Sequence, residues 1–200
     1  MRWLFSQFLV MLVFFACAQT DGVNFSVEDR VQKLNTYYPG ASAGDLEDKQ
    51  SFFDAFPRTF DQFQLLYGFD DVEGAAPLYD NAVDHIPKLF FRLGDAIPKE
   101  RFLQKIVSIA IGGRWDADAV NYFQRGLRQT VMRDVTGAAA VIGTLSEEDQ
   151  LAFWYFFLDG LHPNAEIPNE LGSLESTSPA VYKHLVQAQE NVLSARSQDK

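Results

Sequence analysis

Residues 112–123, GGRWDADAVNYF, contain two aspartates in a D-x-D pattern. Carboxylates at this spacing can ligate a hard cation or form a pair for acid–base catalysis. A cation site needs oxygen ligands from more than one element, and residues two apart on a helix point about 200° away from each other. No EF-hand spacing follows Asp116, so no metal site is predicted here. We expect Asp116 to cap a helix and Asp118 to lie in its first turn, with a functional carboxylate as the alternative.

Arg114 and Trp115 directly precede these aspartates. Arginine and tryptophan are enriched among the residues that dominate protein–protein binding energies. The structural alternative is that Trp115 packs onto the apolar face of the following helix while Arg114 pairs with a nearby acid. We treat both residues, together with the two aspartates, as candidate partner-binding residues at one helix junction.

His85, one of three histidines, lies beside Asp84. A neighbouring acid can tune the pKa of an imidazole, and Pro87 predicts a helix break at this point. Adjacent residues on a helix do not face each other, which weakens the pair as a sign of chemistry. We include both residues among the binding candidates. His162 and His184 fit structural or solvated roles, since no zinc-binding spacing joins the histidines.

The sequence gives no support for nucleophilic catalysis, for a cofactor or for a metal. No glycine-rich phosphate loop occurs, and no S-x-x-K lies in a suitable context. A glycosidase pair of carboxylates has no fixed sequence spacing, so a hydrolase that uses acidic residues stays open. We expect a protein that is not an enzyme. If it is a hydrolase, the Asp84–His85 pair and the two aspartates at 116 and 118 are the first candidates.

The N-terminus predicts export. Met1 and Arg2 form a short basic region, and the apolar stretch after them is long enough for a signal peptide but short for a membrane span. Residues 16–18, Ala-Cys-Ala, fit ordinary cleavage, whereas FFAC at residues 14–17 resembles a lipobox that would lipidate Cys17. Lipidation also explains why an exported chain has a single cysteine. We expect a lipoprotein, with soluble secretion or an uncleaved anchor as alternatives.

The composition is that of a globular domain, with 47% hydrophobic residues in a chain of 200. Phenylalanine occurs 18 times, which predicts a core rich in aromatic rings. The formal net charge of −10 opposes binding to nucleic acid, which needs clusters of Lys and Arg. Nucleic acid is therefore excluded as a partner.

Helix start and stop signals follow one another along the chain. The expected helices span residues 45–56, 59–68, 77–93 with a kink or break at 84–86, 98–111, 116 onward with a division near Gly137, 146–158 and 178–194. Residues 1–18 are assigned to the signal peptide, 19–43 to a polar, partly ordered tether that can hold a short helix over 27–37, and 44–200 to the domain. The predicted fold is all-α, with about seven or eight helices in an irregular orthogonal array.

Residues 52–80 interleave acidic and aromatic residues. As structure, this segment is a pair of amphipathic helices and an acidic loop that contains Asp70, Asp71 and Glu73. As function, it is an acidic surface rimmed by aromatic rings that can take a basic protein or a sugar. Both interpretations place negative charge on the surface at this point.

The sequence as a whole predicts an exported, lipid-anchored helical protein that binds a partner at the bacterial cell envelope, as an adaptor or as an inhibitory, immunity-type protein. The expected partner is another protein, and the membrane is reached through a lipid on Cys17. The expected location is the periplasm or the outer membrane, with secretion as the alternative. The alternative function is a small envelope hydrolase that uses acidic residues, and sequence does not separate a purely structural envelope protein from a binding protein.

Overall fold

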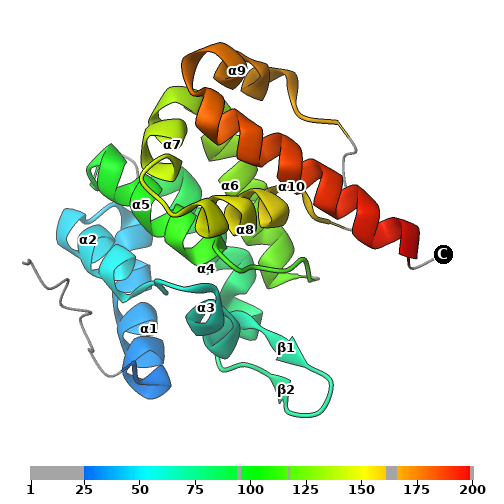
Figure 1. Cartoon of the computed structure of the whole chain (residues 1–200). Helices are drawn as coiled ribbons and strands as arrows, with labels where there is room; N and C mark the ends of the chain where they lie inside the picture. Colours follow the sequence, from blue (N-terminus) through cyan, green and yellow to red (C-terminus); the bar gives the residue numbers. More distant parts are fainter. Residues whose placement is uncertain (1–24, 94–95, 117, 161–165, 199–200) are drawn as a thin grey trace, which may run out of the picture.

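The computed structural model describes residues 25–93, 96–116, 118–160 and 166–198 (Figure 1). Its α-helices are α1 Val27–Ala43, α2 Leu46–Ala55, α3 Phe60–Tyr67, α4 Ala82–Arg92, α5 Lys99–Ala110, α6 Ala119–Arg133, α7 Val135–Ile142, α8 Glu147–Leu158, α9 Leu174–Thr177 and α10 Pro179–Gln198. Two 3-10 turns, Tyr79–Asn81 and Asn169–Ser173, and a ribbon of strands β1 Phe69–Asp70 and β2 Gly74–Ala75 accompany them. The protein is mostly helical, as predicted. The predicted signal peptide, Cys17 and His162 lie outside the described residues.

Helix α8 runs through the middle of the fold, with α10 packed along it (Figure 1). Helices α1 and α2 pair at one side of the molecule, and α4 packs against α6. The central place of α8 follows from its sequence, which is apolar on every side after the first turn. The described residues contain ten α-helices, more than the expected seven or eight. The difference comes from short elements such as α9, which spans four residues.

The core is built largely from aromatic rings, as the phenylalanine content predicts. Its largest fully buried side chains include Trp154, Tyr67, Phe52, Phe53, Phe56, Phe63, Phe123, Phe153, Phe156 and Phe157. The ring centroids of Phe63 and Phe123 are 5.3 Å apart, and those of Phe123 and Phe156 are 6.3 Å apart. These contacts join α3, α6 and α8 into one continuous core.

Several predicted helix starts are confirmed by their capping geometry. The Thr59 hydroxyl accepts the N–H of Gln62 at 3.3 Å at the start of α3. The Ser146 hydroxyl accepts the N–H of Asp149 at 3.1 Å at the start of α8. In each case a side-chain oxygen satisfies an N–H group that the first turn of a helix leaves without a partner.

Helix α1 begins at Val27, like the short helix expected over residues 27–37, but it is longer than expected. It continues through Pro39 and Gly40 to Ala43, and its residues Leu34 and Ala41 are fully buried. A Cβ atom at Gly40 would lie 1.5 Å from the Asp48 carboxylate, so glycine lets α2 approach α1 here. The Pro-Gly pair, which predicts a turn, serves helix packing instead.

The expected kink or break at residues 84–86 does not occur there. Helix α4 runs unbroken from Ala82 to Arg92 with Pro87 inside it, and the break falls earlier, at the 3-10 turn 79–81. Proline removes a single backbone donor, and the buried side chains Ile86 and Leu89 hold the helix against the core on either side of it. Tertiary packing therefore overrides the local signal.

The division expected near Gly137 falls instead at Asp134, between α6 and α7. The Asp134 carboxylate accepts the N–H of Gly137 at 3.3 Å and caps α7, so Gly137 lies within the first turn of that helix. Two other expected features of this region are confirmed. Gly112 has a φ of 73° and follows the end of α5, and the stripe Val120, Phe123, Leu127 and Val131 of α6 is buried.

Candidate functional site

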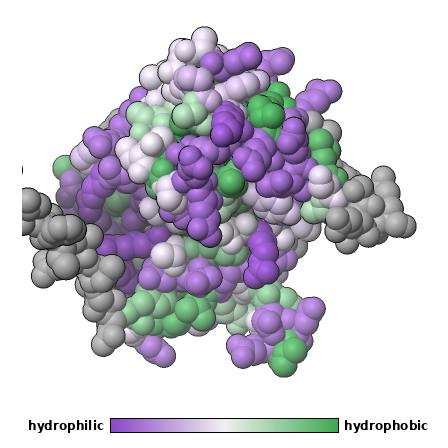
Figure 2. All heavy atoms as spheres, viewed as in Figure 1, coloured by the Kyte–Doolittle hydropathy of each residue, from purple (hydrophilic) through white to green (hydrophobic). Residues whose placement is uncertain are grey.

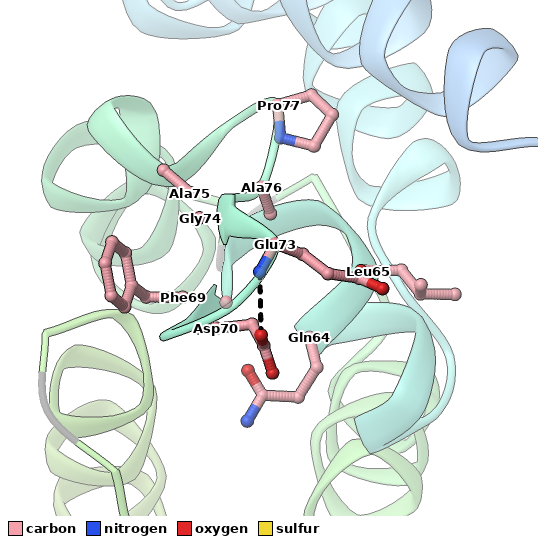
Figure 3. Close-up of a pocket in the computed structure, with 10 residues that line it drawn as sticks. Gln64, Leu65, Phe69, Asp70, Glu73, Gly74, Ala75, Ala76 and Pro77 are labelled. Atoms are coloured by element: carbon pink, nitrogen blue, oxygen red, sulfur yellow. Dashed lines mark hydrogen bonds between the residues drawn. The ribbon is translucent and has the colours of Figure 1, made fainter.

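The ribbon of β1 and β2 projects from the helices just after α3 (Figure 1). Its strands pair antiparallel, with Asp70 opposite Gly74. The Asp70 carboxylate accepts the N–H of Glu73 at 2.9 Å, drawn as a dashed line in Figure 3, and the N–H of Val72 at 2.7 Å. These hydrogen bonds lower the pKa of Asp70 below its ordinary value. Asp70 thus fixes the turn and leaves Asp71, Val72 and Glu73 at its tip.

The tip of this ribbon exposes apolar side chains beside acidic ones. Val72 is 93% exposed, Leu65 54% and Phe69 53%. Asp71 and Glu73, on either side of Val72, are also exposed. In Figure 2 the tip stands out at lower right with hydrophilic and hydrophobic colours side by side. We call residues 69–75 together with Leu65 the hairpin surface.

A cavity of about 450 Å³ lies between the ribbon and α3. It is lined by Gln64, Leu65, Gly68, Phe69, Asp70, Glu73, Gly74, Ala75, Ala76 and Pro77, and Figure 3 shows how most of them surround it. We call it the hairpin pocket. Its lining combines two carboxylates with apolar side chains, which suits a basic side chain with an apolar stem.

A second cavity, of about 210 Å³, adjoins the first and shares Gln64, Gly68 and Phe69 with it. Asp116 and Asp118 both line it, together with Tyr67 and Tyr79. We call it the aspartate pocket. The structure therefore places the two predicted aspartates beside the hairpin surface, which is about 45 residues away from them in sequence.

Tyr79 connects the two aspartates to the ribbon. Its hydroxyl donates a hydrogen bond to the Asp118 carboxylate, and its ring centroid lies 5.7 Å from that of Phe69. The pKa of Tyr79 is raised, first by this hydrogen bond and then by desolvation and the charges of Asp118, Asp80 and Asp116. Three carboxylates therefore act on one phenol, and negative charge is concentrated around it.

The expected capping role of the aspartates is wrong in detail. Asp118, not Asp116, occupies the N-cap position of α6, and its side chain makes no capping hydrogen bond. Its φ of 54° is unusual for a residue other than glycine. The carboxylate is used by Tyr79 instead, a contact that no local pattern predicts.

Arg114 and Trp115 lie at the same junction but take different roles. Arg114 is exposed. The backbone N–H of Trp115 donates to the Asp159 carboxylate at 3.0 Å, and a Cβ atom at Gly160 would lie 3.7 Å from Trp115 Cδ1. Trp115 therefore packs toward the end of α8 and is half-buried, whereas Arg114 is exposed.

Asp84 and His85 are not brought to the aspartate pocket. Asp84 is exposed and lines a separate cavity of about 420 Å³ between α1 and α4. His85 is 1% exposed, and its Nδ1 lies 3.0 Å from the hydroxyl of the buried Tyr67. Burial lowers the pKa of His85 to about 4, although the charge of Asp84 acts in the opposite direction. His85 is thus a neutral core residue at physiological pH.

Ser42 lines the same cavity as Asp84, and residues 40–44 read GASAG, which matches the G-x-S-x-G pattern of serine hydrolases. That motif needs a sharp turn from a strand into a helix. Here Ser42 lies in the last turn of α1, and Gly44, with a φ of 107°, caps the helix by donating its N–H to Gly40 and Ala41. The pattern is a helix C-terminal signal in this chain.

Gln64, Gly68 and Tyr79 line the aspartate pocket and lie within the acidic–aromatic segment 52–80, but no motif singles them out. Gln64 and Gly68 lie one turn apart, and a Cβ atom at Gly68 would lie 2.4 Å from Gln64 Oε1. The Gln64 oxygen is buried and has no hydrogen-bond partner in the described structure. Gln64, Gly68 and Tyr79 could be recognised as pocket residues only after the ribbon had been placed against α6.

Within the described ranges, no group of three or more His, Cys, Asp or Glu residues is arranged to hold a metal ion. None of the helices in this part of the chain has the length and apolar character needed to cross a bilayer. Comparison of the chain with protein-family models, with curated proteins and with solved structures finds no match. The interpretation of the site therefore rests on its own geometry.

Proposed function

We propose that this protein is exported, anchored to the bacterial cell envelope through a lipid on Cys17, and binds a basic protein partner with its hairpin surface. In this role it acts as an adaptor or as an inhibitory, immunity-type protein. The signal peptide over residues 1–18, the lipid and the envelope location are parts of this proposal, and they rest on the N-terminal sequence.

The observation that supports binding most directly is the exposure of Val72, at 93%, on the tip of a projecting ribbon. An apolar side chain held there adds nothing to the core, and the Asp70 turn fixes its position. Phe69 and Leu65 extend the apolar contact toward α3. Together they provide the apolar centre that protein interfaces need.

The charge around this centre indicates the kind of partner. Asp71 and Glu73 flank Val72, and the aspartate pocket adds Asp116 and Asp118. An acidic rim accelerates encounter with a basic partner and disfavours acidic ones. The net charge of −10 for the whole chain acts in the same direction.

A photocrosslinking amino acid at position 72 tests this proposal in cells that express the full chain. We expect a discrete crosslinked protein from position 72 and none from position 46, where Leu46 is 58% exposed on α2. The double change Asp71→Asn and Glu73→Gln should abolish the crosslink, while Glu170→Gln with Glu190→Gln, which removes the same charge elsewhere, should preserve it. If the crosslink from position 72 persists in the Asp71→Asn, Glu73→Gln variant, the partner is not recognised through these charges and the proposal of a basic partner is contradicted.

Anchoring is tested separately with Cys17→Ser. The proposal expects this variant to leave the membrane fraction, since it has no thiol for a lipid. Unchanged membrane retention would overturn the lipid anchor. It would not affect the proposal that the hairpin surface binds a partner, which the crosslinking experiment tests.

A small hydrolase that uses acidic residues is the second candidate, because Asp116 and Asp118 line one pocket together with two tyrosines. His85 takes no part in that pocket, which limits the catalytic groups available there. Hydrolysis of a panel of envelope glycans by the purified chain, lost in Asp118→Asn and retained in Asp84→Asn, would favour this function over binding.

A further inference from the structure

A pocket whose charged side chains are mainly cationic, in contrast to the acidic hairpin surface, lies where the end of α2 meets α5. Its volume is about 260 Å³. It is lined by Phe53, Asp54, Arg58, Arg101, Gln104, Lys105 and Ser108. Three cationic side chains and one carboxylate surround it, in a chain whose net charge is −10. We call it the basic pocket.

Lys105 forms the inner wall of this pocket. Its ammonium donates to the carbonyl oxygen of Phe53 and, at 3.0 Å, to that of Phe56, and its Nζ lies 4.4 Å from the centre of the Phe53 ring. Both carbonyls belong to the C-terminal end of α2, where intrahelical partners become few. The Phe53 carbonyl also accepts the N–H of Phe56 at 3.3 Å. Lys105 thus caps α2 from a neighbouring helix.

The surroundings of Lys105 disfavour its charge. Burial lowers the pKa of Lys105 to about 7, and the positive charges of Arg58, Arg30 and Arg101 act in the same direction, while Asp54 opposes them. A neutral amine has two N–H groups, which match the two carbonyl acceptors, and a protonated amine has a third. Capping therefore does not require the charge, and protonation adds an N–H that the two carbonyl acceptors do not use.

Capping also leaves other donors unused. Arg30 donates to the carbonyl oxygen of Asp54, and Arg101 donates one of its five N–H groups to the Asp54 carboxylate. Across the described ranges, no carboxylate lies within ion-pair distance of Arg58. Arg101 and Lys105, which line the same pocket, add further positive charge beside it. The capping of α2 explains Lys105 and Arg30 but gives no reason for a guanidinium at position 58.

We propose that the basic pocket binds a phosphate group through Arg58, Arg101 and Lys105. With Lys105 protonated, the lining carries an excess of two positive charges, which matches a phosphate dianion better than a monocarboxylate. Guanidinium groups offer paired N–H donors for phosphate oxygens. This site lies apart from the hairpin surface, and it does not depend on the proposed function.

Titration calorimetry of the full chain with inorganic phosphate, at pH 7 and low salt, tests the site. We expect saturable binding that weakens at least tenfold in Arg58→Gln and in Lys105→Met. Arg125→Gln, which removes an exposed arginine from α6, should leave the affinity unchanged. Acetate should bind much more weakly than phosphate. Arg58 is exposed, so its variant is expected to fold even if Lys105→Met does not.

Vesicles distinguish a soluble phosphate from a lipid headgroup. Retention of the Cys17→Ser chain on phosphatidic acid vesicles beyond that on phosphatidylcholine vesicles, lost in Arg58→Gln, assigns the group to a lipid. Saturable phosphate binding without such retention assigns it to a soluble compound. Absence of saturable phosphate binding, or equal affinities in Arg58→Gln and Arg125→Gln, overturns the proposal.

Discussion

Phe52 and Phe53 are neighbours on α2, and each packs against a base, the buried His85 and the half-buried Lys105. The ring of Phe52 meets that of His85 edge-on at 5.4 Å, and the Nζ atom of Lys105 lies 4.4 Å from the Phe53 ring centre. Burial is the largest cause of a lowered pKa at both bases, to about 4 for His85 and about 7 for Lys105. Yet the two regions differ in what surrounds the base.

His85 is enclosed by aromatic rings. The ring centroids of Tyr38 and His85 are 4.7 Å apart, and the Tyr67 hydroxyl bonds to Nδ1. Lys105 instead borders an open cavity that also contains Arg58 and Arg101. A shifted pKa therefore marks burial in both places, whereas a ligand site also needs space and unused donors. Only the Lys105 region meets all three conditions.

The largest effect that separates the two regions is expected from His85→Ala. It removes a buried ring and leaves the Tyr67 hydroxyl without its partner, so we expect a loss of about 3 kcal/mol in the free energy of unfolding. Urea denaturation measures this loss. Val83→Ala, on the exposed face of the same helix, should cost less than about 0.5 kcal/mol. Equal losses in the two variants would show that His85 is not a core residue.

The two bases should respond to pH in separate windows. The unfolded chain protonates His85 near pH 6.5 and the folded chain only near pH 4, so acidification across this window should destabilise wild type more than His85→Gln. The ordinary pKa of Lys105 is 10.5 and its folded value is about 7. Raising the pH from 7 to 10.5 should therefore stabilise wild type relative to Lys105→Met. Parallel pH profiles for wild type and variant would contradict the corresponding pKa shift.

The smallest effect on stability is expected at the hairpin surface. Val72→Ser should change the free energy of unfolding by less than about 0.5 kcal/mol, because the side chain is 93% exposed. The same change should weaken partner capture by the purified chain. A stability loss as large as that of His85→Ala would show that Val72 belongs to the fold and not to an interface.

Local patterns predicted the parts of this structure that depend on neighbours in sequence. The caps at Thr59 and Ser146 and the buried stripe of α6 are of this kind. Proximity in sequence also directed attention to the Asp84–His85 pair, and there it misled, because adjacent residues on a helix point apart. Asp84 faces solvent while His85 faces the core.

Contacts between distant segments could not be predicted in this way. Lys105 reaches a carbonyl 52 residues earlier in the chain, and Tyr79 reaches a carboxylate 39 residues later. Lys105 occupies an unremarkable position on an amphipathic helix, and its chemistry arises only when α5 meets the end of α2. The basic pocket could therefore not be predicted from the sequence. The acidic loop could be predicted, because Asp70, Asp71 and Glu73 lie close together in the sequence.

The most direct test of the contrast between the two regions is an NMR pH titration of His85 and Lys105 in the same sample, with and without inorganic phosphate. We predict that phosphate raises the pKa of Lys105 from about 7, because the bound dianion stabilises the ammonium, and leaves that of His85 at about 4. A Lys105 pKa that does not respond to phosphate, or a His85 pKa that rises with it, would contradict the account.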